Sequence, residues 1–410
     1  MFQFALRRAA TGTGSLASRF YTTGSRSDAP HHERVARQMI RYALGHARSQ
    51  KSGESYAQAM MILEQGRSNL EGGGDTENAR ELFMLAMSTL LYERGEIGDA
   101  LEKLQMVRQS ERASHTLKVA AAEGLVGLNL EAGEDSTSSA LADDCLQLLS
   151  NSEGIVKLRA KAVKGLVHLA LGELKSAETF FDGCQDCSLE DHKDQMGNAS
   201  LSNGVFLHAT GNFSEAKNIY DRLIHVFELE DIAESSYLAS ANMVPGEVLL
   251  GATCALGQLL SQSGKFGEAE DILTKALTKA EEHFGPMHPK VGVVLTCIAT
   301  MFKHKAKLEA SSAILIQEGL YRKAIELLKA PALDSEAANK QVARGDIVAL
   351  ARGGYADVLC IQQNRKAEGE RMRNWAEATW KNRRLSLAQA LEFSEPTQAA
   401  VIDTRICRVV

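Results

Sequence analysis

The chain has 410 residues, of which 44% are hydrophobic and 24% are charged, and its formal net charge at pH 7 is −6. This acidic balance disfavours a general nucleic-acid binder, because such proteins need a basic surface to displace counterions from phosphates. Seven irregularly spaced cysteines exclude a disulfide framework in a chain this long, and only six prolines favour long helices.

The first 27 residues have the composition of an organelle-targeting sequence. They contain four arginines and no acidic residue, since the first carboxylate is Asp28. An Arg-rich, hydroxyl-rich, acid-free and amphipathic start is typical of a transit peptide. Arg19-Phe20-Tyr21 is similar to the site where matrix processing peptidases cut. We therefore expect a mitochondrial matrix location, with a plastid as the alternative, and cleavage after Tyr21 would leave a more acidic protein.

Residues 31–74 are expected to form one or two leading helices, followed by a turn. The segments HERVARQMIRYALGHARS and SYAQAMMILEQGRSNL are rich in helix-forming side chains. Gly72-Gly73-Gly74 ends them, and Asp75 or Thr76 is placed to cap the next helix. These glycines lack the lysine and the preceding strand that a phosphate-binding loop requires.

An internal repeat follows, in which five segments align on one alanine. The alanines are Ala100, Ala177, Ala216, Ala269 and Ala324. Five positions before them stand the glycines Gly95, Gly172, Gly211, Gly264 and Gly319. Twelve positions before them stand the small residues Ser88, Gly165, Gly204, Gly257 and Ser312. Four positions after them stand the large apolar residues Leu104, Phe181, Tyr220, Leu273 and Leu328.

This order of residues fits a pair of antiparallel helices. The first helix would end at the glycine, which accepts a left-handed turn, and the second would start just after it. The small residue and the alanine let the two backbones approach, and the bulky residue fills the gap to the next hairpin. The order small–Gly–Ala–bulky resembles the tetratricopeptide repeat over roughly residues 75–330. The resemblance implies an all-α fold, a right-handed α-solenoid of antiparallel helix hairpins.

Two further hairpins and one longer repeat extend the pattern. A hairpin around Ala140 fits with a small loop insertion, whereas one around Ala367 fits poorly because Arg371 stands where a bulky apolar residue belongs. Residues 285–289 form a Gly-x-x-His-Pro turn that is similar to the longer repeats of the kinesin light chain type. Its last proline suits the first turn of the next helix, and Pro245 plays a similar part earlier in the chain.

The sequence contains one Cys-x-x-Cys pair, Cys184 and Cys187. A zinc site would need two more ligands at suitable spacing, and a redox dithiol would want a helix N-terminus. Cys184 is instead expected late in a second helix, at a small packing position. Histidine pairs of the metalloprotease type, nucleophile elbows and Walker loops are also missing from the sequence. We therefore predict no metal, no cofactor and no enzymatic activity.

The C-terminal part differs in charge. Residues 340–384 hold ten Lys or Arg against five Asp or Glu, together with Trp375 and Trp380. This segment is either a capping helix or a surface for an acidic partner, an anionic membrane or RNA. The tail after Pro396 is expected to be short and irregular. The predicted division is a presequence and lead over 1–30, leading helices over 31–74, the repeat array over 75–384 and a tail over 385–410.

The resemblance also implies where partners bind. First helices of such arrays line a concave groove that takes an extended segment or a helix of another protein. By the family's pattern the groove-lining residues are Asn198, His208, Cys254, Gln258 and Ser261. The Lys/Asn clamp with which some family members grip a chaperone's C-terminal carboxylate does not occur at the matching positions, which disfavours that ligand.

The function expected from these features is a mitochondrial scaffold or adaptor that binds other proteins, with assembly of a matrix or inner-membrane complex as one role. The alternative is an organellar RNA-binding helical repeat protein, which the net charge and the missing 35-residue period disfavour. No stretch reaches the 18–20 apolar residues that a membrane span needs. Peripheral membrane contact remains open, and the sequence does not identify the partner protein.

Overall fold

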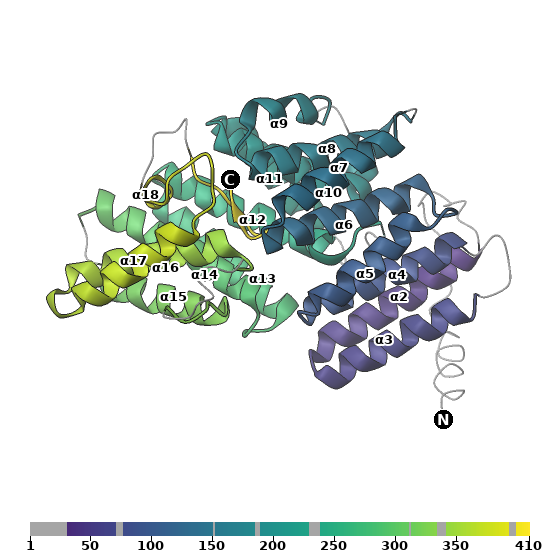
Figure 1. The fold of residues 1–410 in the computed structure, drawn as a ribbon, viewed down its shortest axis with the longest axis horizontal. Coiled ribbons are helices and arrows are strands. Elements are labelled where there is room, and N and C mark those ends of the chain that lie inside the picture. The colour runs from purple at the N-terminus through teal and green to yellow at the C-terminus, as the bar shows by residue number, and fades with distance from the viewer. Residues whose placement is uncertain are drawn as a thin grey trace.

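The structure of the protein is a computed structural model that describes residues 31–70, 77–150, 152–184, 189–228, 238–310, 313–333, 342–392 and 399–410. Within these residues the chain is almost entirely helical (Figure 1). The elements are α2 (His31–Gln50), α3 (Gly53–Ser68), α4 (Glu77–Glu93), α5 (Ile97–Gln109), α6 (His115–Ala132), α7 (Asp135–Leu148), α8 (Ile155–Ala170), α9 (Leu174–Phe181), α10 (Leu189–Ala209), α11 (Phe213–Glu228), η1 (Ala241–Met243), α12 (Pro245–Gln262), α13 (Phe266–Phe284), α14 (Pro289–Leu308), α15 (Ile314–Leu327), α16 (Gly345–Ile361), η3 (Gln363–Arg365), α17 (Lys366–Thr379), α18 (Leu387–Leu391), β1 (Ile402–Asp403) and β2 (Arg408–Val409).

Consecutive helices pair into hairpins, and the hairpins stack side by side along the molecule (Figure 1). The first helix of each hairpin also packs on the first helix of the next, in the series α4, α6, α8, α10, α12, α14 and α16. The chain is therefore an all-α solenoid of helix hairpins, as the repeat predicts. Both leading helices are present, and α2 and α3 pack against α4 at the start of the array.

Glycines in the left-handed conformation make four of the tight turns. Gly95, Gly172, Gly211 and Gly264 have φ between 75° and 85°. At Gly95 the glycine N–H donates to the carbonyl of Tyr92, and the following N–H donates to that of Leu91. These bonds satisfy carbonyls that the helix end would otherwise leave without a partner.

Small residues of the first helices meet bulky residues of the second ones. A Cβ added at Gly257 would lie 2.6 Å from Cγ of Leu273, and one at Gly204 would lie 2.9 Å from Cε1 of Tyr220. Gly165 stands equally close to the ring of Phe181. The repeat alanines Ala100, Ala177, Ala216, Ala269 and Ala324 are completely buried. Backbone contact between paired helices therefore depends on the missing side chains.

The expected register is wrong in the fifth repeat. Gly319 lies inside α15 and forms no turn, and Ser312 lies outside the described residues. The close approach occurs instead at Gly292 of α14, where an added Cβ would lie 3.0 Å from the carbonyl oxygen of Ala324 and from Cγ of Leu328. The alignment failed here because no glycine stands between the end of α14 at Leu308 and the start of α15 at Ile314.

Two further hairpins also differ from expectation. In the α6–α7 hairpin the residue five positions after the turn glycine Gly133 is Ser138, which is completely buried, whereas Ala140 is exposed. A serine takes the alanine position, so no loop insertion is needed. In the α16–α17 hairpin Ala367 is exposed, and Gly369 packs against Cys360 instead.

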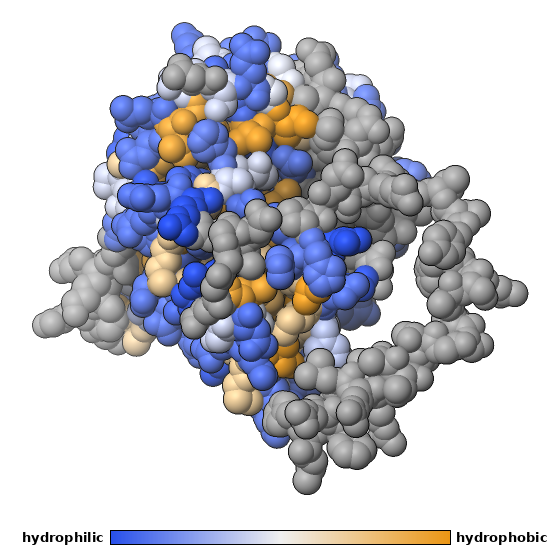
Figure 2. Space-filling view, turned by 90° about the vertical axis from the view of Figure 1, so that its right-hand side faces the viewer, coloured by the Kyte–Doolittle hydropathy of each residue, from blue (hydrophilic) through white to orange (hydrophobic). Residues whose placement is uncertain are grey.

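The two layers of helices differ in burial. Second helices such as α5 and α13 bury one stripe of side chains, as expected for amphipathic helices with one face in water. First helices such as α12 and α14 are buried around nearly their whole circumference. Hydrophilic side chains accordingly cover most of the described part of the face in Figure 2, and apolar groups show between them. Another part of the protein must therefore cover the inner side of the first helices.

Among the described residues, no helix combines the length and the apolar character that a membrane crossing requires. The twelve-residue apolar stretch of α14 is flanked by lysines and lies in the protein core.

Candidate functional site

Residues 399–410 cover the inner side of the array, and we call them the closing hairpin. Its strands β1 and β2 are antiparallel, with Ile402 opposite Val409 and Asp403 opposite Arg408. Val401 and Val410 exchange two main-chain hydrogen bonds of 2.9 Å. Every residue from 401 to 410 is buried. The expectation of an irregular tail is therefore wrong, because this segment is a buried hairpin that crosses the first helices (Figure 1).

Side chains of the array bind the main chain of the hairpin along β1 and at its tip. The Gln258 amide pairs with both main-chain polar groups of Ile402: its Oε1 accepts from the N–H of Ile402 at 2.8 Å, and its Nε2 donates to the carbonyl of Ile402 at 3.0 Å. Lys290 Nζ donates to the carbonyls of Thr404 and Arg405 at 2.6 and 2.7 Å. Asn242 Nδ2 donates to the same Arg405 carbonyl at 3.0 Å. None of these bonds depends on the side chain of the residue that is bound.

The open end of the hairpin is held in the same way. Arg384 donates to the carbonyls of Ala399 and Val410, and Asn382 Nδ2 donates to that of Val409 at 2.6 Å. Gln262 Nε2 donates to the carbonyl of residue 400 at 2.9 Å. Donors from outside the hairpin thus satisfy main-chain oxygens that so short a ladder leaves open.

Two arginines of the closing hairpin supply side-chain contacts. Arg405 Nη1 donates to Asn198 Oδ1 at 3.0 Å and its Nη2 to Ser202 Oγ at 3.1 Å, while Asp403 of the same hairpin pairs with it at 2.7 Å. Arg408 reaches two carboxylates of the array. Its Nε lies 2.6 Å from Asp346 and its Nη1 2.7 Å from Asp135.

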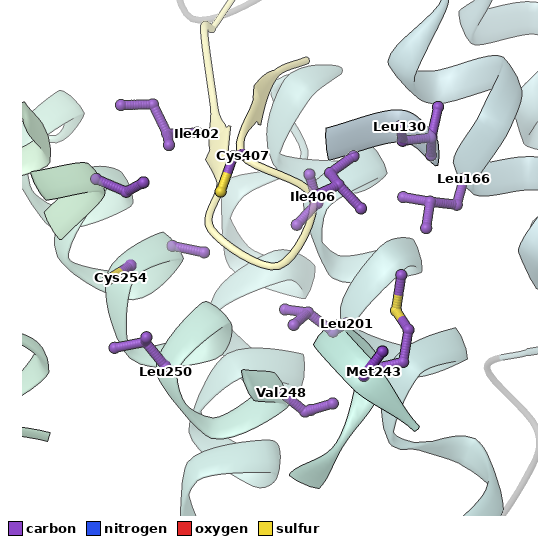
Figure 3. Packing of buried hydrophobic residues seen from close by; sticks show 14 of the residues in the cluster. Leu130, Leu166, Leu201, Met243, Val248, Leu250, Cys254, Ile402, Ile406 and Cys407 are labelled. Atoms are coloured by element: carbon purple, nitrogen blue, oxygen red, sulfur yellow. The ribbon is translucent and has the colours of Figure 1, made fainter. Parts of the chain in front are cut away.

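Apolar residues of the hairpin complete the inner core. Ile402, Ile406 and Cys407 lie among side chains of the first helices and of the segment that leads into α12 (Figure 3). That segment is itself buried: Ala241 N–H donates to Thr89 Oγ1 at 3.0 Å. The inner face of the array is therefore filled by two stretches of the same chain.

A buried charge cluster lies beneath the hairpin. Lys290 Nζ is 3.3 Å from Glu247 and 3.9 Å from Glu131, and Arg344 lies 3.4 Å from Glu131. Burial lowers the pKa of Lys290, but Cys407 and the two carboxylates outweigh it, so that its pKa rises above the usual range. Burial raises the pKa of Glu247 to about 7, and Lys290 only partly offsets it. The ammonium is therefore retained, and the hairpin carbonyls add to its stabilisation.

The structure places the five predicted groove residues on the inner side of the array but not on an open groove. Asn198 and Gln258 contact the closing hairpin directly, as described above. His208 Nε2 is hydrogen-bonded to Gln262 Oε1 at 2.8 Å, so it positions a residue that binds the hairpin. Cys254 and Ser261 are buried. Their role toward a partner protein stays a prediction, since the chain itself occupies this surface.

Sequence reasoning missed Lys290, Asn242 and the two hairpin arginines. The signal for the hairpin was available, because residues 401–410 are rich in β-branched side chains and read as short strands. The surface that binds the hairpin could not be predicted from the sequence, because contacting residues such as Gln258 and Ile402 are 144 positions apart.

Cys184 of the Cys-x-x-Cys pair lies at the end of the α8–α9 hairpin. Cys184 was expected inside the second helix, but α9 ends at Phe181 and Cys184 lies just beyond it, buried. Cys187 lies outside the described residues. Within the part of the chain that the structure describes, no cluster of His, Cys, Asp or Glu is arranged to hold a metal ion.

Several cations of the basic segment 340–384 are engaged within the protein, whereas Lys366, Arg371, Lys381 and Arg383 are exposed. Arg365 binds Glu318 and Arg373 binds Asp357, at 2.6 and 2.9 Å. The Arg352 guanidinium lies 3.8 Å from the ring centre of Trp375, which is buried. These contacts favour the capping role over a binding surface.

One comparison with known proteins agrees with the repeat. Residues 249–290, which cover most of α12, all of α13 and the first two residues of α14, match the tetratricopeptide repeat family. No curated protein matches the chain. Among solved structures, aspartyl phosphate phosphatase F from Bacillus subtilis is similar at 11% identity over 89% of this chain and 97% of that one, with a TM-score of 0.45. The apo form of RapI is similar at 12% identity over 83% and 97%, with a TM-score of 0.39. These scores support no inference about function.

Proposed function

We propose that this protein is a non-catalytic scaffold of the mitochondrial matrix that binds other proteins through the inner face of its helical array. One observation carries the proposal. The inner face already binds a polypeptide segment, and it does so chiefly through donors aimed at main-chain carbonyls. Such contacts suit extended segments of other proteins as well.

The mitochondrial part of the proposal rests on the composition of residues 1–27, which are rich in arginine and contain no acidic residue. These residues lie outside the part of the chain that the structure describes. The long repeats, of the kinesin light chain type, provide the binding array. Assembly of a matrix or inner-membrane complex is the role that we propose for it.

The test is capture of partners from intact mitochondria. The tagged full-length chain is expressed, crosslinked in the organelle and purified under denaturing conditions, alongside a matrix-targeted protein of similar size as the control. We expect one or a few polypeptides enriched in near-stoichiometric amounts. If none is enriched over the control, the scaffold function is wrong.

The RNA alternative is tested with the same purified chain. Filter binding of organellar RNA across a salt series would show a steep loss of affinity with salt if phosphates were neutralised by the protein. We expect no such binding, because the net charge of the chain is −6 and Arg365 and Arg373 of the basic segment are paired with carboxylates.

A further inference from the structure

The contacts of the closing hairpin divide into a general and a specific set. Gln258, Lys290, Asn242 and Gln262 bind its main chain, which any extended segment could offer. Specificity is left to Arg405 and Arg408, the two side chains that reach charged or polar groups of the array. The hairpin therefore has the contacts of a bound peptide ligand that is covalently attached to its receptor.

Charge defines what else could occupy this site. When the hairpin leaves, Asp403 leaves with it, but Asp346 and Asp135 stay on the array without the Arg408 guanidinium. Asn198 and Ser202 likewise lose Arg405. The side chain of Asp346 is only 3% exposed, so an uncompensated negative charge there is costly. The vacated site consequently requires a cationic side chain at the position of Arg408, whereas at the position of Arg405 it offers neutral acceptors to an arginine that brings its own counterion.

The hairpin does not keep this shape by itself. Its ladder comprises two residue pairs, Ile402–Val409 and Asp403–Arg408. An isolated two-stranded hairpin is at best marginally stable in water, and this one is shorter than most. The array therefore folds the segment onto itself, and a linear segment of another protein could be folded in the same way.

We propose that the inner face is a peptide-binding site closed by its own residues 399–410, and that a partner protein enters by exchange. The partner segment carries an arginine at the position of Arg408 and, at the position of Arg405, an arginine with a carboxylate of its own two positions earlier, and it places apolar residues between the two arginines. This proposal rests on the scaffold function above and adds its regulation. The tether gives the hairpin an effective concentration on the order of millimolar, so a partner in trans binds only when the hairpin is weakened or outcompeted.

Exchange can be tested without risking the fold. Residues 393–398 are replaced by a specific protease site, the full chain is folded and purified, and the site is then cut. A synthetic peptide of residues 399–410, fluorescently labelled at its N-terminus and kept reduced, is added, and its binding is followed by anisotropy. Circular dichroism verifies that the cut protein stays helical.

We expect the cut protein to take up the peptide and the uncut protein to bind it at least 100-fold more weakly. A peptide with Arg405→Gln and Arg408→Gln should bind at least tenfold more weakly than the native one, because each charge-assisted bond contributes. On the protein, Asp346→Asn should weaken binding about tenfold, whereas Glu64→Gln, an exposed carboxylate on α3, should leave it unchanged.

Two results would overturn the proposal. In one, the cut protein keeps its own fragment and takes up no peptide while remaining helical, so the hairpin is a permanent part of the core. In the other, both peptides bind equally well. The scaffold function is judged separately by the capture from mitochondria. Arg408→Ala weakens the hairpin but not the array, so the exchange predicts that this variant captures more partner than the parent chain does. Equal capture by the two would retain the scaffold and discard the exchange.

Discussion

The ion pairs of Arg408 allow a sharp prediction about what holds the closing hairpin. Arg408 and its partner Asp346 have side chains that are 5% and 3% exposed. Removing one member of a buried pair leaves the other charge without compensation, which costs about 3–5 kcal/mol. We therefore expect Arg408→Ala to lower the free energy of unfolding by about that amount.

A matched surface pair provides the control. Arg373 binds Asp357 at 2.9 Å, but their side chains are 39% and 36% exposed. Exposed pairs contribute about 0–1 kcal/mol, so Arg373→Ala should lose less than about 1 kcal/mol. Urea unfolding followed by circular dichroism measures both variants, and amide exchange of residues 399–410 reports whether the loss starts in the hairpin.

The physical cause can be separated from simple loss of contacts. If the orphaned Asp346 carboxylate causes the loss, the double variant Arg408→Met with Asp346→Leu should recover most of it, because a packed apolar pair avoids the burial of a charge. Equal losses for Arg408→Ala and Arg373→Ala would refute the reasoning. So would a double variant that is no more stable than Arg408→Ala.

Three further predictions concern packing, pH and targeting. Gly257→Ala should lower the free energy of unfolding by about 1–3 kcal/mol in urea, because its Cβ would lie 2.6 Å from Leu273. Gly45→Ala, with open space around its Cβ, should raise the free energy of unfolding by about 0.5–1 kcal/mol. If both variants were destabilised, the close packing at Gly257 would not be the cause. Burial lowers the pKa of His208 from 6.5 to about 4, so between these pH values the unfolded chain binds a proton that the folded chain does not, and stability falls as pH falls through this window. His208→Gln should remove roughly 2 kcal/mol of the loss between pH 7 and pH 5, and an unchanged pH profile would exclude a neutral buried histidine. In import assays with isolated mitochondria, the chain should be shortened and become protected from added protease only when a membrane potential is present. Deletion of residues 1–21 should abolish import. Import of the shortened chain would show that these residues are not a presequence.

The repeat could be predicted because its determinants are local. Each turn glycine and the small–bulky contact of its hairpin lie within about thirty positions, as for Gly257 and Leu273. The alignment of repeats failed where a different small residue takes the position of the alanine. Ser138 fills the position of the alanine, and the alignment therefore took Ala140 instead. In the fifth repeat a chance glycine at 319 imitated the turn, while the true contact lies at Gly292.

Of the candidate site, some residues on the array could be predicted from the sequence, but the hairpin that faces them could not. Helix periodicity and the repeat register place Asn198 and Gln258 on the inner side, because that depends on their own helices. What faces them depends on residues 399–410, which are brought there by the packing of the whole array. Arg405 and Asn198 are 207 positions apart, and no local pattern encodes such a pairing. The buried Lys290 was hidden for the same reason, since its partners come from α6, α12 and the hairpin.

Amide hydrogen exchange of residues 399–410 in the unmodified full chain tests the central claim most directly. The N–H groups of Val401, Ile402 and Val410 are bonded inside the protein. We expect them to exchange far more slowly than unfolded peptide amides and to lose this protection in Arg408→Ala. Exchange of residues 399–410 at the rate of an unfolded peptide would show an empty inner face and contradict both the closed site and its proposed opening.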